Sequence, residues 1–125
     1  MFDHDDREGL PCREICILPF DFREALLQGE TKQLRLYEER FTKLFDDVSE
    51  NYEGTLGMGL LSPIGIMHTV LLAEVESFNR MEGFGIFLTI RVVGRARIHD
   101  VVLESPYFKA TCTELPDAIP DDLEE

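Results

Sequence analysis

The feature that most constrains the fold is a fifteen-residue alternation between residues 84 and 98. Apolar side chains fill nearly every second position there, and mostly polar or charged side chains lie between them. This period of two predicts a β-strand with one buried face. The segment is longer than a usual strand, and Gly94 interrupts the alternation. Gly94 therefore predicts a bend or bulge at which the strand passes to its next partner, so that the sheet curls into a small barrel.

Shorter extended segments surround this strand. Pro19 is expected to end the first of them, and residues 21–33 to form a long turn with short extended pieces. Turns are also expected at 62–65 and, as a hairpin loop, at 79–83. The expected strands are 13–20, 34–36, 55–61, 67–78, 101–103 and 107–114.

One clear helix is expected from about residue 38 to residue 51. Its apolar stripe recurs with the period of an α-helix, and a helix in so small a domain needs such a stripe for its core. The residues of the stripe are Tyr37, Phe41, Leu44, Phe45, Val48 and Tyr52. The expected fold is mostly β with one main α-helix (α+β), built on a small curled antiparallel sheet of six or seven strands.

Charge divides the chain into a central domain and two acidic ends. Residues 1–9 have net charge −3 and residues 116–125 net charge −5, which leaves −5 of the total −13 for the middle. We therefore expect an acidic tail at 1–12, one domain at 13–117 and an acidic tail at 118–125. Such a field repels nucleic acid and anionic lipid as a whole. The acidic start is unlike a secretory signal or a transit peptide, and no run of residues is apolar enough to span a membrane.

The cysteines and glycines carry no recognisable chemistry. Cys12, Cys16 and Cys112 are sparse and odd in number, which is typical of a reducing compartment. Cys12 and Cys16 have no second pair to complete a zinc site, so no metal is expected. The glycines at 54–59 follow a helix and precede a strand, the reverse of a dinucleotide loop, so no cofactor is expected.

Six local strings, in order, resemble the N-terminal domain of the Lon protease family. Residues 34–41 (LRLYEERF) are similar to the family's L-R-I-F-E-P-R-Y, and 94–98 (GRARI) to its G-x-x-R-F-R-I. The other matching strings are 17–20 (ILPF), 25–29 (ALLQG), 71–75 (LLAEV) and 106–117, from PY to LPD. The chain departs from the family at Gln28 and Glu39, where the family has proline.

This resemblance implies a PUA-like pseudo-barrel that recognises protein substrates. The sequence contains no phosphate-binding loop of a motor and no serine–lysine pair of a protease. We therefore expect a stand-alone, non-catalytic recognition module that acts as an adaptor or docking subunit. Single-domain relatives occur in plastids, so the resemblance implies the plastid stroma or the cytoplasm as its location.

Apolar residues on expected loops are the candidate contacts with protein clients, because exposed Phe and Met form adaptable binding surfaces. They are Phe20, Phe22, Leu26, Leu27, Ile64, Met67 and Met81. Arg91, Arg95 and Arg97 would form one basic patch on a regular strand, either paired with acids such as Glu74 and Glu76 or contacting RNA. Two alternatives to client recognition follow: PUA-like RNA binding, and a structural accessory subunit of a larger complex whose acidic tails lie along a basic partner.

Overall fold

The computed structural model describes residues 12–116. The expected acidic tails lie outside the described residues, apart from Cys12, which begins the first strand. The elements are β1 (Cys12–Asp21), the 3₁₀ turn η2 (Phe22–Glu24), β2 (Thr31–Leu36), α1 (Glu39–Asn51), β3 (Thr55–Ser62), β4 (Gly65–Ile66), β5 (Thr69–Met81), β6 (Gly85–Leu103) and β7 (Phe108–Leu115). The predicted fold class, mostly strands with one helix, is confirmed. No helix in this part of the chain is long and apolar enough to cross a membrane.

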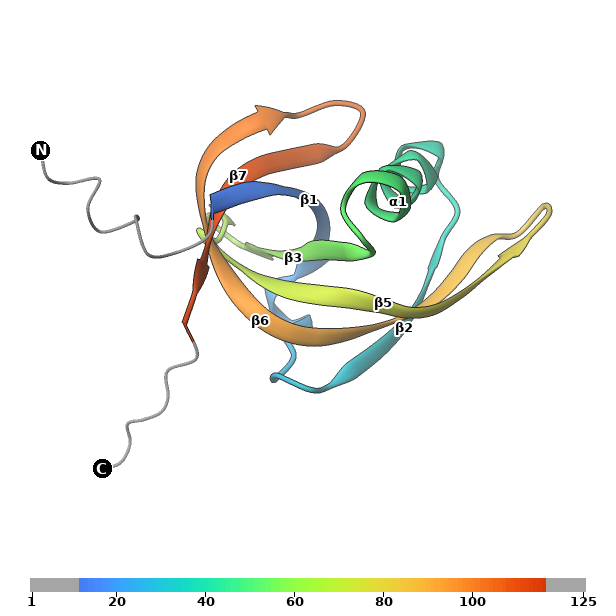
Figure 1. Cartoon of the computed structure of the whole chain (residues 1–125), viewed down its shortest axis with the longest axis horizontal. Helices are drawn as coiled ribbons and strands as arrows, with labels where there is room; N and C mark the ends of the chain where they lie inside the picture. The colour runs from blue at the N-terminus through green and yellow to red at the C-terminus, as the bar shows by residue number, and fades with distance from the viewer. Residues whose placement is uncertain (1–11, 117–125) are drawn as a thin grey trace, which may run out of the picture.

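Five strands form a closed ring. They follow the order β1-β7-β6-β5-β3, and β1 returns to pair with β3. The β1–β3 pair is parallel, whereas the other pairs in the ring are antiparallel. The strand β2 pairs with β6 outside the ring, and β4 forms a short hairpin with β3. Figure 1 shows the curled sheet with α1 packed across one opening.

The long strand β6 contains a bulge, beyond which its side chains occupy the opposite faces of the sheet. Gly94 pairs with Leu72 on β5 but Val92 pairs with Ala73, so Val93 is an extra residue on β6. The predicted irregularity at Gly94 is thus confirmed, one residue from its expected place. An extra residue reverses which face the following side chains occupy. The expectation that residues 84–98 share one buried face is therefore wrong: Val92 and Ala96 pack in different cores.

The two cores lie on opposite faces of the sheet. The core beneath α1, which we call the helix-side core, contains Leu44, Phe45 and Val48 together with alternate residues of β1, β3, β5 and β6. The second core consists of Ile15, Ile17, Val70, Leu72, Ala96, Ala110 and Cys112. Strand β1 contributes to both cores, which explains why its residues 15–18 are all buried.

The helix has the predicted position and buried stripe. Leu44, Phe45 and Val48 are fully buried, and Phe41 and Tyr52 pack partly against the helix-side core. Tyr37 is an exception with 63% of its surface exposed, because it precedes the first helical residue, Glu39. The helical period therefore does not apply to it.

The expectation of a separate strand at 101–103 is wrong, because these residues are the continuous end of β6. Boundaries of β1, β2 and β5 also differ from the expected ones. Strand β1 continues through Pro19 to Asp21, because its pairing with β7 ends at Ile17 and Pro19 has a partner only on β3. Proline is tolerated on such an open edge, where its nitrogen is not needed as a donor. Strand β2 begins three residues early, at Thr31, and β5 extends through three residues of the expected loop to Met81.

Close packing between β1 and β3 requires glycine in β3. A Cβ atom at Gly59 would lie 2.6 Å from the Ile17 Cγ2 atom, and one at Gly57 would lie 3.0 Å from the Ile15 Cγ2 atom. The absence of these side chains lets the two isoleucines cross over β3. The parallel β1–β3 pair that closes the ring depends on this contact.

Candidate protein-binding surface

Five of the seven loop apolars are exposed as predicted. Ile64 is 97% exposed and Leu27 is 74% exposed, and Phe22, Met67 and Met81 are each more than two-fifths exposed. The expectation for Phe20 is wrong, because it lies in the extension of β1 and is 8% exposed within the helix-side core. Leu26 is partly buried against the same core.

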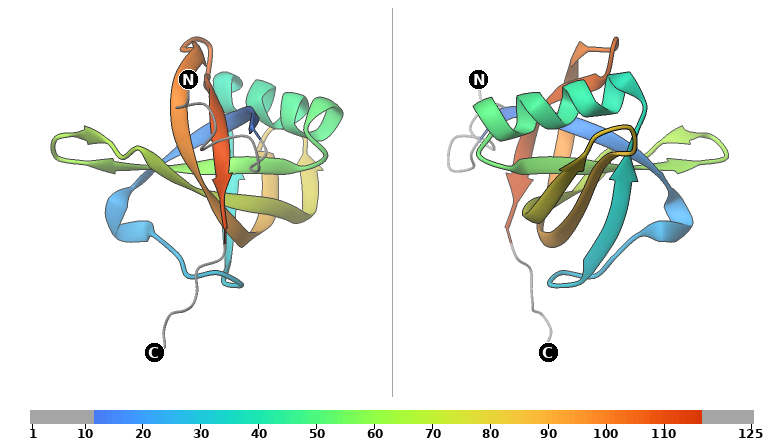
Figure 2. Two further views of the ribbon diagram at one scale, coloured as in Figure 1. Left: turned by 60° about the vertical axis from the view of Figure 1, so that its left-hand side comes forward. Right: turned by 90° about the vertical axis from the view of Figure 1, so that its right-hand side faces the viewer.

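These residues do not form one surface. Met81 lies at the end of the β5–β6 hairpin, and Leu27 lies in the loop between η2 and β2. Figure 2 shows the β3–β4 and β5–β6 hairpins projecting from the barrel in different directions. Phe22 of η2 and Leu61 of β3 line one shallow depression, so Phe22 belongs with the β3–β4 hairpin.

We define the hairpin surface as Phe22, Leu61, Ile64 and Met67. The turn of the hairpin keeps Ile64 outward: the Ser62 hydroxyl donates a hydrogen bond to the Gly65 carbonyl at 2.9 Å and accepts one from the Ile64 amide at 3.3 Å. Gly65 has a φ of 129°, a backbone conformation that residues other than glycine rarely adopt. Leu61, Ile64 and Met67 are thus carried by a short hairpin whose turn is internally hydrogen-bonded.

An apolar groove of about 300 Å³ continues from this surface. Leu61 belongs to both, and Ile66 of β4 lines the groove beside it. The opposite wall comes from the start of α1 and from the segment that joins β6 to β7. The lining residues are Ile17, Pro19, Arg40, Phe41, Leu61, Ile66, Glu104, Pro106, Tyr107 and Phe108. The volume is at the lower end of the range for ligand sites, enough for one or two side chains of a partner.

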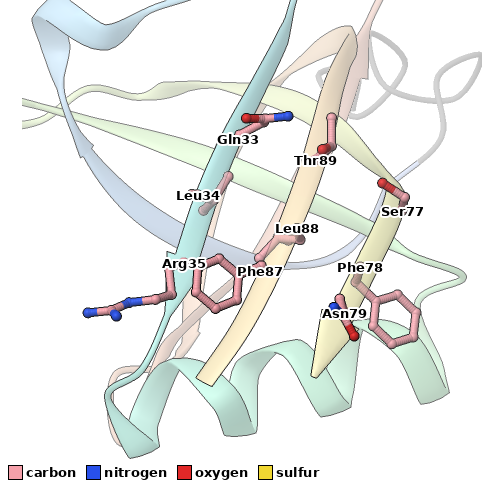
Figure 3. A pocket seen from close by; sticks show the side chains of 9 residues that line it. All are labelled: Gln33, Leu34, Arg35, Ser77, Phe78, Asn79, Phe87, Leu88 and Thr89. Atoms are coloured by element: carbon pink, nitrogen blue, oxygen red, sulfur yellow. The ribbon is translucent and has the colours of Figure 1, made fainter. Parts of the chain in front are cut away.

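A larger groove of about 480 Å³ lies on the face formed by β2, β6 and β5 (Figure 3). Its lining is mixed: Gln33, Ser77, Asn79 and Thr89 lie among the apolar residues Leu34, Phe78, Phe87 and Leu88. The Arg35 guanidinium stacks at its margin, 5.9 Å from the centroid of the Phe87 ring. This groove is more open than the groove beside the hairpin surface, and polar side chains form a larger part of its lining.

The three arginines of β6 do not form one patch. The register sets Arg91 opposite Glu74, but after the bulge it sets Arg95 opposite Leu71, whose side chain lies on the other face of β5. Arg91 is paired as the sequence suggested: its Nε atom is 2.6 Å from a carboxylate oxygen of Glu76, and its NH2 atom 4.0 Å from one of Glu74. Within residues 12–116, Arg91 is the one residue of β6 that forms ion pairs, and Arg95 and Arg97 form none.

The sequence analysis missed a polar cluster centred on Asp47 of α1. One carboxylate oxygen accepts hydrogen bonds from the Lys109 ammonium at 2.8 Å and the Tyr107 hydroxyl at 2.6 Å. The other accepts one from the Asn51 amide at 2.7 Å. The Asp47 and Lys109 side chains are only 13% and 16% exposed. Because Lys109 and Tyr107 come from the β7 end of the chain, the cluster ties the helix to the sheet.

Electrostatics in this cluster keep each group in one protonation state at neutral pH. Burial would raise the pKa of Asp47, but hydrogen bonds from Lys109, Tyr107 and Asn51 outweigh it and lower that pKa to about 2. The hydrogen bond to Asp47 raises the pKa of Lys109. Burial and then the Asp47 charge raise the pKa of the Cys16 thiol to about 12, so that thiol stays protonated and unreactive. The cluster is therefore a structural network.

No local signal in the sequence connects these residues. Asp47 lies beside the apolar stripe of the helix. Its partners Tyr107 and Lys109 are sixty or more residues further along the chain. In residues 12–116, no three His, Cys, Asp or Glu side chains are placed to hold a metal ion. Cys12 is exposed and Cys16 is buried, so the two thiols face different environments.

No family model and no curated protein matches this sequence. Among solved structures, the chain is similar to a Lon N-terminal domain protein from Xanthomonas campestris, with a TM-score of 0.72 and 19% identity over 89% of this chain. It is also similar to the N-terminal domain of the Lon protease of the Mycobacterium avium complex, with a TM-score of 0.69 and 19% identity over 88% of this chain. The matches span 64% and 59% of those two chains. The chain therefore has the fold of a Lon N-terminal domain.

Proposed function

We propose that this chain is a non-catalytic protein-binding module that recognises extended apolar segments of client proteins through the hairpin surface. The observation that carries the proposal is the continuity between the exposed residues of the β3–β4 hairpin and the apolar groove beside it, with Leu61 common to both. The substrate-recognition role implied by the Lon N-terminal fold supports the same assignment. The module would act as an adaptor or docking subunit in a reducing compartment, the plastid stroma or the cytoplasm.

Physical chemistry favours an apolar client. Ile64 exposes almost its whole side chain at the tip of a turn, where it stabilises nothing within the chain. Covering it and filling the groove would remove apolar surface from water, which is the main driving force of protein association. The hydrogen-bonded Ser62–Gly65 turn holds the hairpin that forms one wall of the groove, which favours a preformed site for the client.

RNA binding is less favoured as a function. Arg91 of the expected basic patch already pairs with Glu76. The bulge in β6 directs the Arg91 and Arg95 side chains to different faces of the sheet. A strongly acidic chain also repels a polyanion at long range. An accessory role in a larger assembly remains compatible with the hairpin surface, since it would use the same apolar contacts with a permanent partner.

Substitution of the hairpin tip tests the proposal. Ile64→Ser and Phe22→Ser should each weaken binding of a fluorescently labelled, chemically unfolded apolar polypeptide by about fivefold to a hundredfold, the effect of losing one well-packed contact. Because Ile64 is exposed, the free energy of unfolding of its variant should change by less than about 0.5 kcal/mol.

Phe84→Ser is the matched control, because Phe84 is also an exposed apolar residue of a hairpin turn, 58% exposed at the other hairpin. It should leave binding unchanged. Equal losses of affinity in all three variants would mean that any exposed apolar residue suffices, and unchanged affinity in the Ile64 and Phe22 variants would place the binding surface elsewhere. Leu26→Ser is unsuitable, since Leu26 packs on the helix-side core.

A further inference from the structure

The outer edge of β2 is a second feature with a binding capacity of its own. Strand β2 pairs with β6 along one edge, and no strand within residues 12–116 pairs with its other edge. The six residues of β2 contain no proline and no bulge against β6. An unpaired strand edge presents a row of backbone donors and acceptors that an extended peptide can complete.

The register identifies which groups point outward. The Val92 amide donates to the Glu30 carbonyl at 2.9 Å, so Glu30 directs its carbonyl toward β6. Backbone groups alternate along a strand, and the same direction therefore recurs at Lys32, Leu34 and Leu36. The amides and carbonyls of Thr31, Gln33 and Arg35 point to the open edge.

A groove of about 340 Å³ runs beside this edge. It separates β2 from the last four residues of β1 and the start of α1, and its floor includes Leu18, Leu34 and Leu36. Side chains of an added strand would alternate between this groove and the opposite face of β2. Figure 2 shows the side of β2 that faces away from β6, bounded by the segment that leads from β1.

The charges beside the edge specify the added strand. The three carboxylates that line the groove are each paired within the chain, Asp21 with Arg23, Glu24 with Lys32 and Glu38 with Arg40. Arg35 instead stacks on the Tyr37 ring at 4.6 Å from its centroid, and no carboxylate within residues 12–116 pairs with it. A carboxylate on the added strand could reach it, while apolar side chains would enter the groove. We propose that β2 accepts, by strand addition, an extended partner segment in which acidic and apolar residues alternate. This site is separate from the hairpin surface and from the function proposed for it.

A second copy of the chain is a poorer occupant. Two β2 strands that paired antiparallel through their outward backbone groups would place Gln33 opposite Gln33 and Thr31 opposite Arg35. A second copy would therefore offer Arg35 no carboxylate. The edge therefore favours an acidic partner segment over its own duplicate.

The probe for the test is an acetylated, amidated peptide of alternating glutamate and valine, added to the full chain. Amide hydrogen exchange, followed residue by residue by NMR, should slow at Gln33 and Arg35, whose amides face the edge. The amides of Leu34 and Leu36 should be protected already in the free protein. A peptide of alternating lysine and valine should produce no protection. Equal protection along both sets of amides, or none with either peptide, would overturn the proposal.

Gln33→Pro removes one outward donor without removing a hydrogen bond to β6. It should lower affinity for the glutamate–valine peptide about tenfold, whereas Ile64→Ser should leave that affinity unchanged. Arg35→Glu, which retains every backbone group, should also weaken binding of the glutamate–valine peptide and strengthen that of the lysine–valine peptide. Full affinity in both variants would contradict strand addition at β2. Self-association of the free chain that Gln33→Pro abolishes would assign the edge to a second copy instead.

Discussion

Replacing Phe45 by Ala is expected to lower the free energy of unfolding by about 3–5 kcal/mol, a large part of what a small domain has. The Phe45 side chain is fully buried in the helix-side core. Its ring meets the Phe78 ring edge-on, with centroids 5.0 Å apart, and the Arg80 guanidinium lies 5.3 Å from its centroid. Alanine would leave a cavity where helix and hairpin meet.

Chemical denaturation measures this effect, with Tyr37→Ala as its control. Tyr37 has the same helical spacing in the sequence but is 63% exposed, so its substitution should cost less than about 1 kcal/mol. Equal midpoints for the Phe45 variant and the wild type would mean that the helix face is exposed, and α1 would then be the better candidate for a partner-binding surface.

Replacing Asp47 by Asn is expected to cost about 2–4 kcal/mol, because it leaves the buried Lys109 ammonium without a countercharge. Asparagine keeps the shape of the side chain but not its charge, and it presents an amide where Tyr107 or Lys109 now donates. Thermal or chemical unfolding at pH 7 measures the loss. Glu39→Gln is a matched control, since the Glu39 side chain is 82% exposed in its pair with Lys43 and should contribute little.

The Asp47 contribution should also depend on pH. Its pKa is lowered from 3.8 to about 2 in the folded protein, so the folded state binds this proton more weakly than the unfolded chain. The stabilisation is therefore present above about pH 4 and is lost as the pH falls toward about 2, by about 2 kcal/mol in all. The difference in unfolding free energy between wild type and Asp47→Asn should shrink across that window. A difference independent of pH would show that the carboxylate charge plays no part.

Much of the fold could be predicted because the apolar periodicity of a single segment indicates whether that segment is a helix or a strand. The helix that buries Phe45 has an uninterrupted period, and the strand through Ile90 keeps its period up to the bulge, so the patterns predict the first residue of each element to within one position. The reversal at Val93 could not be predicted, because an extra residue in one strand is defined only by its pairing with another. Pro19 predicts the end of β1, because a proline has no amide hydrogen to donate to a neighbouring strand. Only the topology shows that no donor is needed at this position.

The candidate site was predicted in part for the same reason. Ile64 lies between Pro63 and Gly65, a local turn signal that correctly indicates exposure. Phe20 has no such signal: its burial follows from the extension of β1 beneath α1. The groove that joins Leu61 to Tyr107 depends on contacts between distant segments, as does the Asp47 cluster. Sequence patterns indicate which side chains are apolar and near turns, but not which of them meet.

The most direct test of client binding by the hairpin surface is fluorescence anisotropy across a salt series with two labelled probes. One probe is an apolar unfolded peptide, and the other is single-stranded RNA. Apolar burial is barely screened by ions, whereas phosphate contacts release counterions and weaken steeply with salt. We expect the peptide to bind with little dependence on salt and the RNA to bind weakly or not at all. Submicromolar RNA binding that falls steeply with salt, without peptide binding, would contradict the proposed function.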